Sequence, residues 1–160
     1  MGLDNGIYIR YNIDNLPEPD GHVGSNYLSI PYALYQNLDL IHVERDKDND
    51  ICLCAEVVYW RKWWGVRNQV VNYLEDKYHT TQPGTFSWSL DTLDCYTIIE
   101  ILRDFDNEET WENEGRSIWE YKECNIHYQI QEDIAELKRI IDLLNKKDPR
   151  VKEIYFYDSY

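Results

Sequence analysis

Residues 126–160 read IHYQIQEDIAELKRIIDLLNKKDPRVKEIYFYDSY, and this stretch decides the fold class. Its first part predicts a helix, because the apolar residues at 126, 130, 134, 137, 141 and 144 recur at spacings of three and four. The pair Lys146 and Lys147 before Pro149 suits the C-terminal end of a helix. From Val151 to Tyr157, aromatic and β-branched residues predict a strand.

Working outward, the other end of the chain has a matching strand. Residues 6–13 (GIYIRYNI) alternate in character after an Asn5-Gly6 turn signal, so we expect a strand with one face buried. The first and last strands are similar in composition and are predicted to lie in one sheet. Residues 38–44 could form a further strand.

Two more helices are predicted between these ends. No proline interrupts residues 54–78, and apolar residues at 57, 60, 64, 71 and 74 favour a helix over this range. Ser89 is the expected N-cap of another helix, whose apolar residues continue to Phe105. The predicted fold class is therefore α+β, with three main helices packed on a small, mostly antiparallel sheet that contains the N- and C-terminal strands.

The chain has the length of one domain and a strongly acidic composition. It has 160 residues, of which 43% are hydrophobic, so it can bury a core and is not a disordered acidic tail. Its 16 Lys and Arg face 30 Asp and Glu, which gives a formal charge of −14. This charge argues against direct DNA, RNA or anionic membrane binding. No apolar run approaches the roughly 20 residues of a membrane span, and the first residues do not resemble a signal peptide. We therefore expect a cytoplasmic protein with one domain, 1–160.

The sequence predicts no cofactor, no metal site and no catalytic residue. The four cysteines are expected to be free thiols, and Cys52-x-Cys54 is too closely spaced for a zinc knuckle. Asp46-x-Asp48-x-Asp50 lacks the Gly and Glu of a calcium loop. No nucleophile, P-loop or dinucleotide motif occurs.

His42 and Glu44 lie two residues apart on a predicted strand and would share a face. Such a pair could bind a metal or share a proton. A solvated strand face is the favoured interpretation.

One aromatic and basic segment invites a functional interpretation. Residues 59–68 (YWRKWWGVRN) hold three of the six Trp and three basic residues of this acidic chain. Indole or phenol rings can stack a base while a guanidinium binds phosphate. The candidate ligand-binding residues are Trp60, Arg61, Lys62, Trp63, Trp64, Arg67 and Tyr157.

The helical wheel leaves an alternative open for this segment. Arg67 falls within the apolar stripe, and a guanidinium there needs a partner, so pairing with a carboxylate is favoured over a ligand-binding role. Arg61 and Lys62 turn to the other side of the same predicted helix. They serve one pocket with Arg67 only if the fold or a second subunit closes over them.

Four blocks of the sequence carry a resemblance: MGLDNGI at 1–7, YWRK at 59–62 with Trp64, Arg67 and Asn68, SIW at 117–119, and YFYDSY at 155–160. Together they resemble a family of small phage and prophage proteins of Firmicutes. Residues 16–49 look like an insertion relative to shorter members. The resemblance implies no reaction or cofactor. It implies a phage protein acting in a bacterial cytoplasm, where small accessory proteins often disarm host defences.

We therefore expect a non-catalytic binding protein that sequesters a nucleotide-derived immune signal, with a small anionic nucleotide as its partner. The alternative is an acidic inhibitor that binds a host defence protein directly. It would use the carboxylates of residues 104–114 to imitate a nucleic acid, although a solvated loop is the favoured interpretation of that stretch. An enzyme that cleaves the signal has no support from a motif. A homodimer would cover apolar surface that one core cannot bury.

Overall fold

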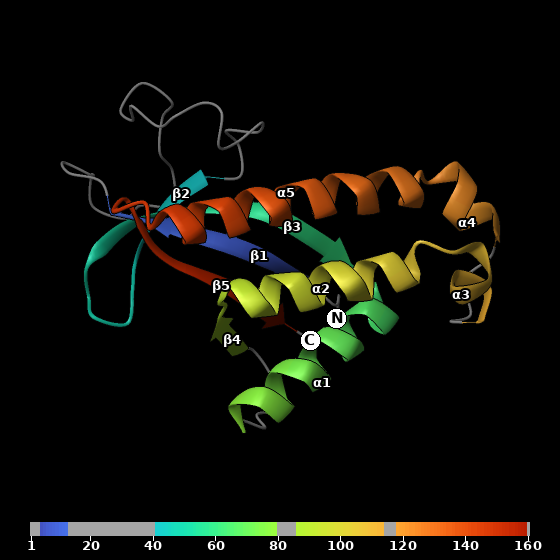
Figure 1. Cartoon of the computed structure of the whole chain (residues 1–160), viewed down its shortest axis with the longest axis horizontal. Helices are drawn as coiled ribbons and strands as arrows, with labels where there is room; N and C mark the ends of the chain where they lie inside the picture. The colour runs from blue at the N-terminus through green and yellow to red at the C-terminus, as the bar shows by residue number, and fades with distance from the viewer. Residues whose placement is uncertain (1–3, 13–40, 80–85, 114–117, 160) are drawn as a thin grey trace.

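The computed structural model describes residues 4–12, 41–79, 86–113 and 118–159 (Figure 1). Residues 16–40 of the predicted insertion and residues 38–40 of the strand predicted at 38–44 lie outside these ranges. The fold class is α+β, as predicted. None of the described helices is both long enough and apolar enough to cross a membrane.

Within the described ranges, five strands form one sheet in which every neighbouring pair is antiparallel. Their order across the sheet is β2-β3-β1-β5-β4. The bounds are β1 Asp4–Tyr11, β2 Ile41–Arg45, β3 Ile51–Arg61, β4 Phe86–Ser89 and β5 Val151–Ser159. The terminal strands β1 and β5 are neighbours, which confirms the prediction that they share a sheet. Gly6 of β1 is required by close packing, because a Cβ there would lie 2.4 Å from the Val58 carbonyl oxygen.

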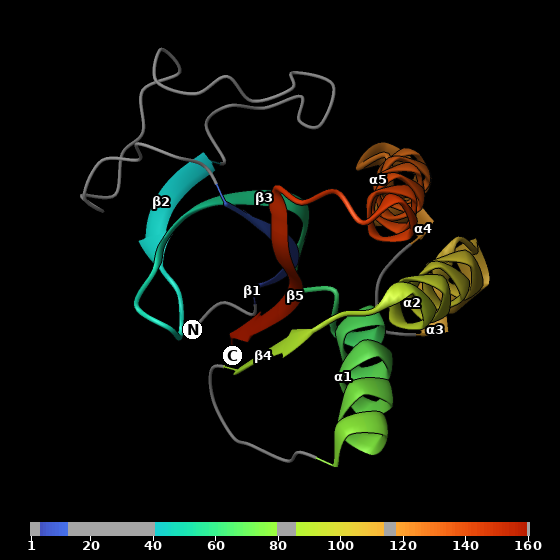
Figure 2. The ribbon, with the colours of Figure 1, turned by 60° about the vertical axis from the view of Figure 1, so that its left-hand side comes forward.

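The described residues form five helices, and the three long ones lie on one side of the sheet (Figure 2). They are α1 Trp64–Tyr78, α2 Thr92–Phe105, α3 Glu108–Asn113, α4 Ile118–Glu123 and α5 Ile126–Lys146. The core lies between these helices and the sheet. It includes Ile7, Ile9, Ile154 and Phe156 from the terminal strands. The predicted stripe of α5 is confirmed from Ile126 to Ile141, with Ile140 added to it and Leu144 only partly buried.

The helix predicted for residues 54–78 is wrong over its first ten residues. Residues 51–61 form β3, and the helix begins at Trp64. β3 lies between β1 and β2, and Cys52, Leu53, Cys54 and Ala55 are buried in succession. A strand buried on both faces loses the alternation that identifies strands in a sequence, so its apolar spacing resembles that of a helix.

Two boundaries also differ from the prediction. The N-cap of α2 is Asp91, whose carboxylate accepts the Asp94 N–H at 2.8 Å in a capping box. Ser89 instead ends β4, a strand that the sequence analysis did not predict. The acidic residues 104–114 do not form a simple loop, because Glu108–Asn113 form α3 and Trp111 of this helix is buried.

Candidate functional site

The seven candidate residues do not gather around one pocket. Trp60 and Trp63 belong to the core, where their rings stack with centroids 6.2 Å apart. The Trp60 indole donates its Nε1–H to Asp133 of α5 at 2.9 Å, and Trp63 meets Trp111 edge to face. Both indoles therefore hold β3 and α1 against the helical layer.

Arg67 has the carboxylate partner that the alternative interpretation required. Its Nε and Nη2 groups donate to the two oxygens of Asp158 at 2.9 and 2.6 Å, and Asn5 Nδ2 donates to the same carboxylate at 2.9 Å. Asp158 is 1% exposed. The guanidinium joins α1 to β5 and, through Asn5, to β1. Its bidentate arrangement is a structural one.

Tyr157 lies on the opposite face of the sheet from Arg67. Successive strand residues alternate between faces, and Asp158, the next residue of β5, is the one that meets α1. The Tyr157 ring is partly buried and stands edge to face with Tyr8, with centroids 6.0 Å apart. It therefore lies across the sheet from Trp60 and Arg67, but on the same face as Tyr59, since Tyr59 and Tyr157 pair with Gly6 from either side.

The remaining candidates, Arg61, Lys62 and Trp64, are all exposed and lie where β3 passes into α1. Trp64 is 49% exposed. Tyr59, which the sequence analysis did not include, alternates with buried Trp60 and so shares a strand face with Arg61; it is 40% exposed. We call these four residues, 59, 61, 62 and 64, the junction surface.

The backbone of the junction surface has an unusual conformation between two buried tryptophans. Lys62 has a φ of 60°, in the left-handed region that non-glycine residues rarely adopt. Buried Trp60 and Trp63 on either side of the exposed cations hold this conformation in place. Tyr59 donates to Asp4 at 2.7 Å, and this hydrogen bond raises the pKa of the phenol. The junction thus presents two cations and two rings beside the buried side chains of Trp60 and Trp63.

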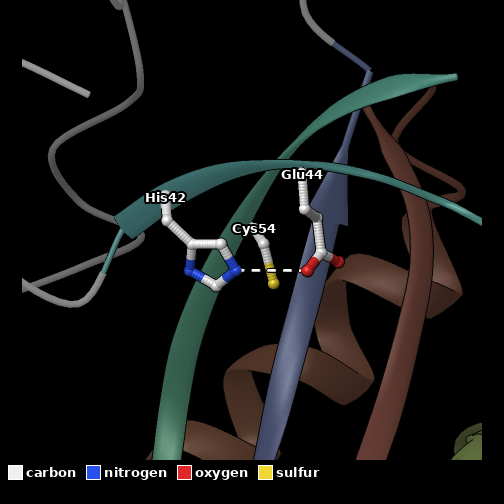
Figure 3. A group of neighbouring side chains, drawn as sticks. All are labelled: His42, Glu44 and Cys54. Carbon is white, nitrogen blue, oxygen red and sulfur yellow. Dashed lines mark hydrogen bonds and ion pairs between the residues drawn. The ribbon is translucent and has the colours of Figure 1, made fainter. Parts of the chain in front are cut away.

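A second group of polar side chains lies on the sheet face away from the helices. Arg10 of β1 donates to Glu44 at 2.6 Å and to Glu153 at 2.5 Å, and its guanidinium lies 4.1 Å from the centre of the Tyr155 ring. His42 Nε2 is 3.1 Å from Glu44, and Cys54 Sγ is 3.2 Å from the Tyr155 hydroxyl. Figure 3 shows that His42, Glu44 and Cys54 point toward one another from β2 and β3.

Burial and charge set the protonation states in this second group. Burial raises the pKa of the Cys54 thiol to about 12. Burial also acts to raise the pKa of Glu44, but hydrogen bonds from His42 and Arg10 outweigh it and lower that pKa to about 2. At neutral pH the group therefore holds a carboxylate beside a thiol.

The Asp46, Asp48 and Asp50 carboxylates do meet at the β2–β3 turn, but they serve the turn itself. Asp46 accepts the backbone N–H groups of Asp48 and Asp50 at 2.9 and 3.0 Å and pairs with Lys152. The four cysteines are free thiols, as predicted, with Cys124 exposed. No family model, curated protein sequence or solved structure matches this chain.

Proposed function

We propose that the protein is a non-catalytic binding protein that captures a small anionic nucleotide on the junction surface, and so sequesters a nucleotide-derived immune signal of the host. The host context comes from the resemblance to phage and prophage proteins. The observation that carries the proposal is the exposure of Trp64 two residues after the exposed cations Arg61 and Lys62, in a chain of formal charge −14.

The chemistry of the junction surface matches a nucleotide in both of its parts. Trp64 and Tyr59 offer ring faces on which a base can stack, a contact worth roughly 1–3 kcal/mol for each base. Arg61 can bind phosphate through two parallel hydrogen bonds, while Lys62 supplies a point charge. Because long-range repulsion by the acidic surface is screened beyond about 8–10 Å, these local cations can still hold an anion.

The proposal is tested by calorimetric titration with cyclic dinucleotides, cyclic trinucleotides and ADP-ribose derivatives. Trp64→Ala should weaken binding of the retained ligand about tenfold or more, the loss expected from one stacking contact. Arg61→Ala should weaken it by a similar factor and reduce its dependence on salt.

Matched controls exist on α2 and α5. Tyr96 of α2 is 52% exposed and Lys138 of α5 is exposed, so Tyr96→Ala and Lys138→Ala remove the same kinds of group from other elements. Both should leave the affinity unchanged. Equal losses in the control and junction variants would contradict the assignment of the site.

The acidic inhibitor is the second candidate, supported by one feature of α3. Trp111 is buried while Glu108, Glu109 and Glu112 are exposed, so the helix holds three carboxylates at the surface. Reversing these charges to Lys should abolish capture of a host defence protein if this candidate holds. The same triple variant should bind a nucleotide as the wild type does if the junction surface is the site.

A further inference from the structure

Three different donor atoms meet on the sheet face away from the helices. Cys54 is the cross-strand partner of His42, and Glu44 lies two residues further along β2 on the same face. The Cys54 sulfur, a His42 ring nitrogen and a Glu44 carboxylate oxygen all lie within 4.8 Å of one another. Figure 3 shows the three side chains pointing toward one another from β2 and β3.

We propose that His42, Glu44 and Cys54 form a binding site for a borderline-soft divalent cation of the Zn²⁺ type. Thiolate, imidazole and carboxylate are the three ligand types that Zn²⁺ takes in proteins, whereas Mg²⁺ and Ca²⁺ prefer oxygen alone. Three protein ligands leave one tetrahedral position for water or an added ligand. On binding, the Cys54 sulfur forms a bond to the metal and its proton passes to solvent.

Surrounding hydrogen bonds already orient the carboxylate. Glu44 uses Oε1 to accept from Arg10 at 2.6 Å and from Tyr155 at 3.4 Å, which directs Oε2 toward His42 at 3.1 Å. Arg10 is held in turn by Glu153. Partners of this kind fix the geometry of metal ligands and contribute substantially to affinity.

The charges around the site favour a cation. Arg10 carries +1 and the carboxylates of Glu44 and Glu153 carry −2, so these groups sum to −1. A divalent cation that displaces one thiol proton adds +1 and brings the sum to zero. The His42 side chain is 37% exposed, which gives an entering ion contact with solvent although Cys54 is buried.

The experiment titrates the purified chain with Co²⁺, a spectroscopic substitute for Zn²⁺, and then displaces it with Zn²⁺. A thiolate ligand gives a near-ultraviolet charge-transfer band that oxygen ligands do not give. We expect this band at one metal per chain, and its loss on addition of Zn²⁺. Cys54→Ser should abolish the band, and His42→Asn should weaken Zn²⁺ binding at least tenfold.

Cys52→Ser is the matched control, because Cys52 is buried on the same strand and face while its sulfur contacts Asp46 at 3.6 Å. The band should persist in this variant, in Cys124→Ser and in Asp48→Asn. The absence of a stoichiometric band in the wild-type chain would overturn the proposal. So would a band that survives Cys54→Ser, and neither result depends on whether His42→Asn folds.

Discussion

The guanidinium of Arg67 is predicted to stabilise the fold rather than bind a ligand. Arg67→Ala leaves the Asp158 carboxylate buried without its guanidinium partner, and we expect it to lower the free energy of unfolding by about 3–5 kcal/mol. Urea denaturation measures this loss. Arg61 is exposed at the end of β3, so Arg61→Ala should change the free energy of unfolding by less than about 0.5 kcal/mol. Equal stability of the two variants would contradict the assignment.

Asp133 gives the fold a defined dependence on pH. Burial raises its pKa to about 7, although the hydrogen bond from Trp60 acts to lower it. Between pH 3.8 and about 7 the folded chain therefore holds a proton that the unfolded chain has lost, so stability falls as pH rises through this window. Above it, this contribution is constant.

Asp133→Asn should remove this fall in stability with rising pH. Relative to wild type, the variant should gain on the order of 2–4 kcal/mol of unfolding free energy between pH 4.5 and pH 8. Denaturation of both proteins at the two pH values measures the gain, and contributions from Glu132 and Glu136 are common to both. A difference between the proteins that stays constant with pH would show that Asp133 titrates normally.

Between elements, Asp94 joins α1 to α2. It is fully buried and accepts from Tyr73 at 2.9 Å, from Lys77 at 2.7 Å and from Tyr78 at 2.6 Å, while also completing the α2 capping box. Burial acts to raise its pKa, but these donors outweigh it and lower the pKa.

Asp94→Ala should therefore destabilise the protein by about 2–4 kcal/mol, through the lost cap and the lost ion pair. Asp142→Ala is the control, since its partner Lys146 is exposed and such pairs contribute less than about 1 kcal/mol. Thermal unfolding compares the two. A melting temperature of Asp94→Ala equal to that of the control would contradict this role.

Elements with one buried face were predictable from the sequence, and the central strand was not. α5 follows the helical period because only one side of it, from Ile126 to Ile141, is buried. β1 and β5 have strong β propensity, and the two strands pair with each other in the sheet. The first part of β3, Cys52–Ala55, is buried on both faces, so these residues carry no period that distinguishes the strand from a helix. β4 has only four residues, which is too short for a pattern.

The amino-acid composition identifies the segment of the candidate site, but it does not tell which of its side chains are exposed. The sequence places three tryptophans and three cations between residues 60 and 67, yet only the change from strand to helix near residue 62 decides which are exposed. Because that change was predicted too early in the chain, Trp60 and Trp64 were expected on one stripe. The meeting of His42 and Glu44 with Cys54 depends on strand register, which no local pattern gives.

Across the molecule, one face of the sheet packs against the core, and the other face carries polar side chains. The long helices cover one face (Figure 2), and Trp60 of β3, Trp63 and Arg67 of α1 join the sheet to this helical layer. The other face holds the polar group around Arg10 and the Cys54 cluster. The junction surface lies at the end of β3, where an acidic chain presents exposed cations and rings.

The most direct test of sequestration mixes the purified chain with the nucleotide panel, removes unbound compound, denatures the complex by heat and identifies what is released. The proposed function predicts an intact nucleotide released from the wild-type chain and a strongly reduced amount from Trp64→Ala. Release of a cleaved fragment would show an enzyme instead. Retention of no compound from the panel would contradict nucleotide capture.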